Sequence, residues 1–296
     1  MEEKLRKFEE YRAGVCKKAN AFLFIGIALM VLGIILIMAI EEPLYIILLV
    51  VGLIFTIVNS SMKSKLSSKF KQEIIIDLVR ETYPGCTYMP RNGLTFTEMM
   101  TPGLFKRPDK WYTEDYLKTT FDDVEFEMCD FTFQERHVTT DSKGHTRTTY
   151  VTYAKGRFMV FDYKREFNQV VKIVENAYLG VDTYKLSKIE TESLEFNKKF
   201  KVFTSDSLTA FYVLTPQIQL KLLELESKFK GSIYFAYMKG KLYVAICDNV
   251  SILDINASKK VSLETIETLK SQLLLPASII NELGLSSSKY QEGDAI

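Results

Sequence analysis

The first sixty residues contain two long apolar runs separated by a short turn. Residues 21–40 are all apolar, and a second apolar run follows at residues 43–58. A helix rises about 1.5 Å per residue, so about 20 such residues cross a hydrocarbon layer about 30 Å thick. Backbone polar groups inside lipid must be hydrogen-bonded within the segment, which favours helices. The pattern predicts a two-span transmembrane helical hairpin.

The turn and the flanks of the two runs predict the orientation of this hairpin. Glu41 and Glu42 precede Pro43, which suits the first position of a helix. The turn carries two acids and no base, whereas both outer flanks are basic, and bases near span ends are retained in the cytoplasm. We therefore expect a multi-pass protein of the cell membrane with both termini cytoplasmic. The flanking bases are Lys4, Arg6, Lys7, Arg12, Lys17 and Lys18 on one side, and Lys63, Lys65, Lys69 and Lys71 on the other.

Other interpretations of this region fit less well. A cleaved signal peptide would have a shorter apolar core and a small-residue exit site, and a buried hairpin of a soluble protein would show helical periodicity. A single span or a re-entrant pair stays open. Lys63, Lys65, Lys69 and Lys71 are predicted contacts for lipid head groups, at roughly 1 kcal/mol each near an anionic surface. The alternative is that they only set the topology.

After the second run the pattern changes to a helix and then to strands. Residues 61–85 predict a juxtamembrane helix that ends at Pro84-Gly85. Alternation of apolar and polar positions then indicates strands, and it shifts register near Cys129 and Asp130, which predicts a β-bulge there. Threonine-rich segments on either side of Asp141 and Gly144 predict an exposed hairpin over residues 137–152.

The last third of the chain mixes strands and helices. Residues 199–203 and 210–214 are typical of strands, and Thr215-Pro216 predicts the start of a helix. Lys239-Gly240 predicts a hairpin turn, because glycine permits a positive φ. A final helix is expected from Ser262, interrupted at Pro276 and ended by Gly284.

These patterns predict an α+β fold with a mostly antiparallel sheet in the cytosolic region. A weak internal similarity between residues 153–163 and 237–247 leaves open that this region is built from two β-rich halves. The expected organisation is a basic cytosolic N-terminus (1–20), a transmembrane hairpin (21–60), a juxtamembrane helix (61–85), a cytosolic α+β region (86–284, with halves 86–180 and 181–284) and a disordered tail (285–296).

Charge and cysteine usage exclude some classes of function. The chain has a formal net charge of +1, so its composition indicates no strongly basic face and no role in binding nucleic acid. Cys16, Cys86, Cys129 and Cys247 are scattered without a zinc-site spacing, which predicts reduced structural thiols rather than disulfides.

The chain carries no recognised catalytic motif. Phosphate-binding loops, nucleophile elbows and zinc-protease motifs are all absent from the sequence, so we expect no cofactor and no catalytic residue can be assigned. Both histidines, His137 and His145, fall in the polar hairpin, and their spacing does not favour a metal site, even with Asp141 as a third ligand. The acidic residues Asp122, Asp123, Glu125, Glu127 and Asp130 fit the solvated face of a strand better than a catalytic or cation-binding cluster.

Six motifs follow one another along the chain: WxxEDYL (111–117), VxFEMCD (124–130), KGRFMVFDY (155–163), SLEFNKKFKV (193–202), FYVLTP (211–216) and KLYVAI (241–246). In this order they resemble a bacterial family of membrane proteins, catalogued as domain of unknown function 3137. The resemblance runs from the apolar runs to about Ile255. It implies no assigned activity, cofactor or catalytic residue, and it implies a LemA-type membrane protein as a neighbour. The threonine-rich hairpin looks like an insertion relative to the family pattern.

Three functions remain open at this stage. The chain is a non-enzymatic cytosolic module held at the membrane to bind or scaffold another protein or lipid, a subunit of a larger membrane assembly, or an enzyme with an unrecognised site near the acidic strand. We favour the first, because catalytic motifs are missing. A pocket with several buried carboxylates would favour the enzyme.

Overall fold

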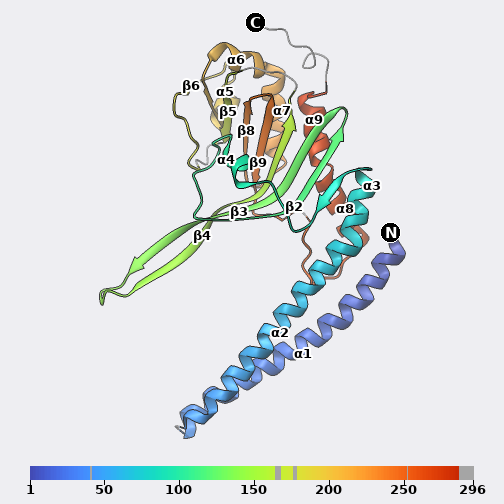
Figure 1. Cartoon of the computed structure of the whole chain (residues 1–296), viewed down its shortest axis with the longest axis vertical. Coiled ribbons are helices and arrows are strands. Elements are labelled where there is room, and N and C mark those ends of the chain that lie inside the picture. The colour runs from blue at the N-terminus through green and yellow to red at the C-terminus, as the bar shows by residue number, and fades with distance from the viewer. Residues whose placement is uncertain (41, 164–167, 176–178, 252, 287–296) are drawn as a thin grey trace. The chain divides into compact units, whose positions relative to one another are not determined.

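The computed structural model describes residues 1–40, 42–163, 168–175, 179–251 and 253–286 (Figure 1). The chain divides into two compact units. Unit 1 comprises Met1–Glu81 and Leu253–Ser271, and unit 2 comprises Thr82–Ile252 and Gln272–Ile296. Leu285, the first residue of the tail predicted over residues 285–296, is buried. The tail from residue 287 onward lies outside the described residues.

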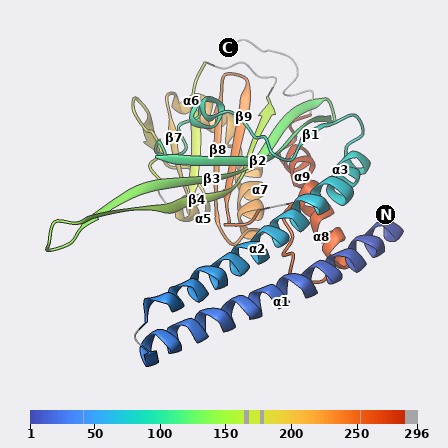
Figure 2. The ribbon, with the colours of Figure 1, turned by 60° about the horizontal axis from the view of Figure 1, so that its bottom comes forward.

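Unit 1 is built on two long helical stretches that lie side by side (Figures 1 and 2). The predicted reversal between them is confirmed, and Pro43 lies in the first turn of η1, as expected. The second stretch continues through a π-helical turn to Thr82, just before Pro84, so the predicted juxtamembrane helix extends the second apolar helix. The elements of unit 1 are α1 (Glu2–Ile40), η1 (Pro43–Tyr45), α2 (Ile46–Phe70), η2 (Lys71–Ile75), α3 (Ile76–Thr82) and α8 (Leu263–Leu273).

Glycines let the apolar parts of α1 and α2 approach at backbone distance. A Cβ added to Gly26 would lie 2.8 Å from the carbonyl oxygen of Gly52, and a Cβ added to Gly52 would lie 2.6 Å from that of Gly26. Small residues that permit such contacts are typical of helix pairs in membranes. Away from the glycines these apolar parts are mostly uncovered.

The opposite end of the helix pair has a packed core. Phe8 of α1 and Phe70 of α2 are buried, with ring centres 5.2 Å apart. Ile75 and Val79 of the second stretch are also fully buried. The basic N-terminus, for which the sequence predicted no element, is therefore part of a packed helix.

Unit 2 contains a nine-stranded sheet among the described residues, in the order β1-β2-β3-β4-β9-β8-β5-β7-β6, with every neighbouring pair antiparallel. The predicted α+β class is confirmed. The strands are β1 (Thr87–Met89), β2 (Lys110–Phe121), β3 (Val124–Thr140), β4 (Thr146–Asp162), β5 (Val171–Glu175), β6 (Ser187–Ile189), β7 (Phe200–Thr204), β8 (Ser232–Met238) and β9 (Lys241–Cys247). The helices are α4 (Phe96–Met100), α5 (Leu194–Lys199), α6 (Ser207–Val213), α7 (Pro216–Ser227) and α9 (Leu275–Leu283).

Both faces of the sheet are buried, and this explains the shifted alternation in β3. Phe126 faces Tyr83, whose ring centre is 5.5 Å away, whereas Phe131 and Phe133 pack against Phe105 on the other face. The predicted bulge lies in the neighbouring strand instead, where two residues of β2 oppose Cys129 alone. The alternation shifts because different faces of β3 are covered along its length.

The structure corrects one predicted strand and confirms the final turns. Residues 210–213 belong to helix α6, and Leu214 is its C-cap. The Asp206 carboxylate caps the start of this helix by accepting a hydrogen bond from the Thr209 N–H at 2.8 Å. The β8–β9 turn at Lys239-Gly240 is confirmed, and Gly284 ends α9 in the left-handed conformation.

Strands from both predicted halves of the cytosolic region share this one sheet. β5 lies in the first predicted half, yet it is hydrogen-bonded between β8 and β7 of the second. The repeated Lys-Gly pair is not equivalent in the two places, since Gly156 lies within β4 and Gly240 lies in a turn. The internal similarity therefore reflects strand composition rather than a repeated architecture.

Candidate functional site

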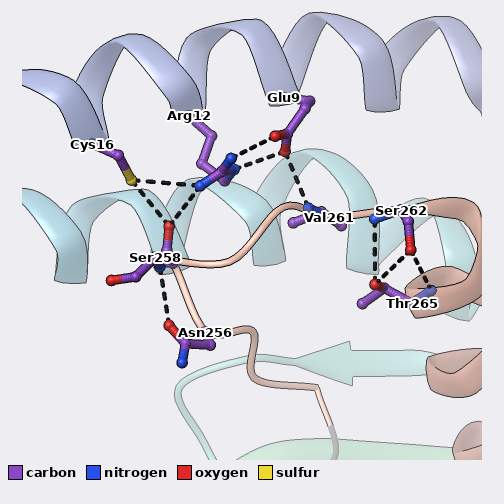
Figure 3. Close-up of polar contacts among 9 residues, drawn as sticks. Glu9, Arg12, Cys16, Asn256, Ser258, Val261, Ser262 and Thr265 are labelled. Carbon is purple, nitrogen blue, oxygen red and sulfur yellow. Dashed lines mark hydrogen bonds and ion pairs between the residues drawn. The ribbon is translucent and has the colours of Figure 1, made fainter.

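A cluster of polar contacts within unit 1 joins α1 to the segment that leads into α8 (Figure 3). Glu9, Arg12 and Cys16 follow one another at helical spacing, so they lie on one face of α1. Their partners are the backbone groups of Ala257 and Val261. We call these five residues the clamp.

The centre of the clamp is a bidentate ion pair. Arg12 Nε donates to Glu9 Oε2 at 2.7 Å, and Arg12 Nη2 donates to Glu9 Oε1 at 2.5 Å. The Arg12 residue is only 8% exposed. A planar guanidinium that meets a carboxylate in this way combines charge with a fixed orientation.

The same two side chains hold the backbone of the facing segment. Arg12 Nη1 donates to the Ala257 carbonyl oxygen at 3.2 Å, and the Cys16 thiol donates to the same oxygen at 3.0 Å. The Val261 N–H donates to Glu9 Oε2 at 3.1 Å. Within the clamp, the segment is therefore held through one backbone carbonyl and one backbone N–H.

The environment of the clamp favours the charged forms of both partners. The hydrogen bond from Arg12 lowers the pKa of Glu9, and the hydrogen bond to Glu9 raises the pKa of Arg12. A lowered carboxyl pKa stabilises the fold above the ordinary glutamate value of about 4.3, and this contribution is lost as the pH falls through the lowered pKa. The clamp is thus fully charged near neutral pH.

The segment is preorganised before it reaches α8. The Asn256 Oδ1 accepts a hydrogen bond from the Ser258 N–H at 3.0 Å, and Ser262 and Thr265 exchange hydrogen bonds at the start of the helix (Figure 3). Local side-chain to backbone bonds of this kind fix turns and helix caps. Ala257 and Val261 are also buried, so apolar packing accompanies the polar contacts.

The four lysines predicted to contact lipid have different environments. Lys65 is exposed and Lys63 is half-buried. The Lys69 ammonium lies 3.7 Å from the centre of the Tyr11 ring and 3.6 Å from Glu73.

Lys71 does not fit the predicted set. It is 7% exposed, and its ammonium lies 2.8 Å from Asp254 Oδ1 within unit 1. Lipid contact by Lys63, Lys65 and Lys69 stays a prediction.

The acidic residues of the sequence analysis do not form one cluster. Asp122 and Asp123 make a turn with positive φ, while Glu125 and Glu127 pair with Lys118 at 2.7 and 3.2 Å. Asp130 is 3% exposed and, by strand alternation, faces the side opposite to these glutamates. The solvated-face interpretation is right for the two glutamates and wrong for Asp130.

Asp130 borders a pocket of about 360 Å³ in unit 2. Glu114, its cross-strand partner on β2, and Arg91 also line this pocket. None of the described lining residues is a histidine, cysteine or lysine. The carboxylates and the guanidinium suit a polar ligand, and they indicate no particular reaction. The other lining residues are Pro90, Tyr112, Thr113, Phe131, Thr132 and Ser251.

Buried polar pairs beside this pocket escaped the sequence analysis. Arg157, opposite Asp130 on β4, forms a buried ion pair with Asp248, which follows β9. The Tyr88 hydroxyl donates to Asp115 Oδ1 at 2.6 Å, and burial, together with the Asp115 charge, raises the pKa of Tyr88. The one signal in the sequence was an arginine within an apolar strand.

The two histidines have separate partners. His137 lies opposite Thr149 and contacts Glu135 at 2.8 Å, whereas His145 lies beyond the strand and contacts Asp141 at 3.1 Å. As predicted, they are not cross-strand partners.

Comparison with known proteins gives a family for part of the chain. Residues 152–285 match the family described as protein of unknown function (DUF3137). We call these residues the DUF3137 domain, after the family that they match. The predicted resemblance is confirmed over this range. The motifs at 111–117 and 124–130 lie before it, and the match extends past Ile255 to include α8 and α9.

The other comparisons add little to this domain. No curated protein matches the chain. Among solved structures, the chain is similar to the crystal structure of the mycobacterial trehalose monomycolate transport factor A, TtfA. The identity is 8%, the TM-score is 0.37, and the similarity covers 67% of this chain and 90% of that chain.

The family assignment gives the clamp a clear position. Ala257 and Val261 belong to the DUF3137 domain by sequence, yet they lie in unit 1 with α1. The clamp therefore attaches one segment of the DUF3137 domain to the polar end of the helix pair.

Arg12→Ala should release this segment. The substitution removes the bidentate guanidinium partner of the largely buried Glu9 carboxylate and one hydrogen-bond donor to Ala257. We expect this to lower the free energy of opening of the segment by about 2 kcal/mol. Lys259 and Lys260 are exposed in the segment. We therefore expect trypsin to cut the full-length variant there more than about tenfold faster than the natural protein, because about 1.4 kcal/mol corresponds to a factor of ten.

Two variants on the same helix control this measurement. Arg6→Ala removes an exposed arginine of α1 and should leave the cleavage rate unchanged. Arg12→Lys keeps the charge without the fork and should give an intermediate rate. Equal rates for Arg12→Ala and Arg6→Ala would show that the clamp does not hold the segment.

Proposed function

We propose that this protein is a membrane-anchored module whose DUF3137 domain binds or scaffolds another membrane protein at the cytoplasmic face. The two apolar helices are the anchor, both termini are cytoplasmic, and the role is not enzymatic. The observation that carries this proposal is the contrast between the two ends of the helix pair in unit 1.

The apolar end exposes more large apolar side chains than a protein surface in water usually does. Phe24 is 73% exposed, Met38 is 78% exposed and Leu44 is 69% exposed. The most apolar 18-residue stretch of each helix is only 11% buried. A core helix of a soluble protein would be mostly covered, whereas a lipid-facing helix has this pattern.

The polar end supports an anchor that is more than a flexible tether. Phe8 and Phe70 pack there, and Glu9 and Arg12 hold residues of the DUF3137 domain. Because the helices continue from the apolar end into this packed end, the anchor and this segment of the domain belong to one ordered unit.

A binding role is supported by the chemistry of unit 2. Its pocket presents Asp130, Glu114 and Arg91 without a catalytic motif. The LemA-type protein implied by the family resemblance is the partner that we propose.

The orientation is testable with one added cysteine. Glu42 is exposed at the start of η1, between the helices. We expect a membrane-impermeant maleimide to label Glu42→Cys in intact cells and to leave the natural protein unlabelled, because its four cysteines would all lie inside.

Ser64→Cys is the matched control for this labelling. Ser64 is exposed beyond the other end of the second apolar run, and it should react only after the cells are permeabilised. Labelling of Ser64→Cys in intact cells, or of Glu42→Cys only after permeabilisation, would contradict the proposed orientation.

The binding role is testable by purifying the intact chain from its own membranes in mild detergent. We expect a membrane protein to remain bound in a fixed ratio, as identified by mass spectrometry. A tagged two-span protein without this domain, expressed at the same level, should not retain it. Recovery of lipid alone would argue against a scaffold. A chain that begins at Ser64 would lack the anchor, but it is a poor control because it also lacks Glu9 and Arg12 of unit 1.

A further inference from the structure

The distal part of the β3–β4 hairpin is a two-stranded ribbon without a covering layer. β2 pairs with β3 only as far as Gln134, and β9 pairs with β4 only from Arg157 onward. The ribbon extends about 20 Å past Gln134, at about 3.4 Å per residue, and projects from the sheet (Figure 1). Isolated two-stranded ribbons are marginally stable in water, so this one gains from a surface to bind.

The ribbon and its base are basic in a chain that is nearly neutral. Residues 106–110 and 135–150 contain six lysines and arginines against three carboxylates. Glu135 pairs with Lys106 and His137. Asp141 accepts a hydrogen bond from the Lys143 N–H, and Asp109 accepts one from the Arg136 N–H. The local carboxylates are thus already engaged.

Three cations of the ribbon are available for an external partner. Arg136, Lys143 and Arg147 are exposed, and none of them pairs with a carboxylate in the part of the chain that the structure describes. Arginine and lysine side chains of this kind bind phosphate groups by charge and by hydrogen bonding.

Apolar and aromatic side chains accompany these charges. Arg136 lies opposite Tyr150, and Val138 lies on the same face by strand alternation. Val138 is 51% exposed and Tyr150 is 40% exposed. A tyrosine beside basic residues is typical of the boundary between water and lipid head groups.

We propose that this ribbon is a second membrane contact, which binds the head groups of anionic phospholipids. The inference rests on the proposed function, because the apolar helices keep the ribbon near a membrane and raise the effective concentration of lipid. Arg136, with Tyr150 and Val138 on the same face, and Lys143 in the turn contact the head groups. Arg147, opposite Thr139, adds positive charge from the other face of the ribbon. The ribbon thereby fixes the domain against the membrane surface.

The test is hydrogen exchange of the full-length protein in lipid nanodiscs. One sample contains phosphatidylcholine alone, and the other contains one part phosphatidylglycerol in about four. We expect amides of residues 135–150 to exchange at least about tenfold more slowly in the anionic discs, and the difference to disappear in high salt, which screens surface charge.

Two triple variants make this result specific. Arg136→Gln, Lys143→Gln and Arg147→Gln together should abolish the difference while β4 amides at Phe158 and Phe161 remain protected, which shows that the sheet is folded. Lys185→Gln, Lys188→Gln and Lys230→Gln remove the same charge elsewhere in unit 2 and should preserve the difference.

Equal exchange in the two kinds of disc would overturn the lipid proposal. Protection that instead requires an acidic protein, with no effect of lipid charge, would also overturn it and identify a protein partner. Incorporation of the chain into discs is read separately by gel filtration and reports on the anchor alone. The anchor and the ribbon can therefore fail independently.

Discussion

The buried ion pair between Glu9 and Arg12 is the interaction on which unit 1 depends. Each partner uses its remaining hydrogen-bonding capacity on the backbone of one facing segment, through Ala257 and Val261. A charged pair with little solvent exposure is costly to break on one side, because the other charge is left uncompensated. It therefore specifies which segment packs against α1, in addition to any stability it adds.

This arrangement links two parts of the sequence that are about 250 residues apart. Unit 1 takes Leu253–Ser271 from within the DUF3137 domain and combines it with the first 81 residues. The chain consequently passes between the two units more than once. A domain defined by the family match cannot be cut from the helices without leaving buried groups such as Val261 without partners.

The sequence predicted the elements whose signals are local. The apolar runs, the turn at Pro43, the hairpins and the break at Pro276 follow from residue chemistry within a few positions. The strand predicted at residues 210–214 is wrong, because Asp206 caps a helix there. The shift in β3 was read as a bulge in that strand because the sequence does not show which face of the sheet is covered.

The candidate sites were harder to predict, because they combine residues far apart in the chain. Lys71 appeared as one of several juxtamembrane bases, but Asp254 binds it in a buried position. Arg12 likewise appeared only as a flanking charge. Asp130 was predicted to be solvated because apolar and acidic residues alternate along the strand before it. Its burial follows only from packing on both faces of the sheet. Long-range pairing of this kind leaves no periodic signal.

The most direct measurement is native-state hydrogen exchange of the full-length protein in membrane discs. If the clamp makes residues 253–271 part of unit 1, the amides of Val261 and α8 will have the same opening free energy as residues near Phe8 and Phe70. This free energy will also decrease with denaturant concentration in the same way for both sets of amides. If those amides instead open with β8 and β9, or at a free energy near zero, then the segment does not belong to the helix pair and the central claim is wrong.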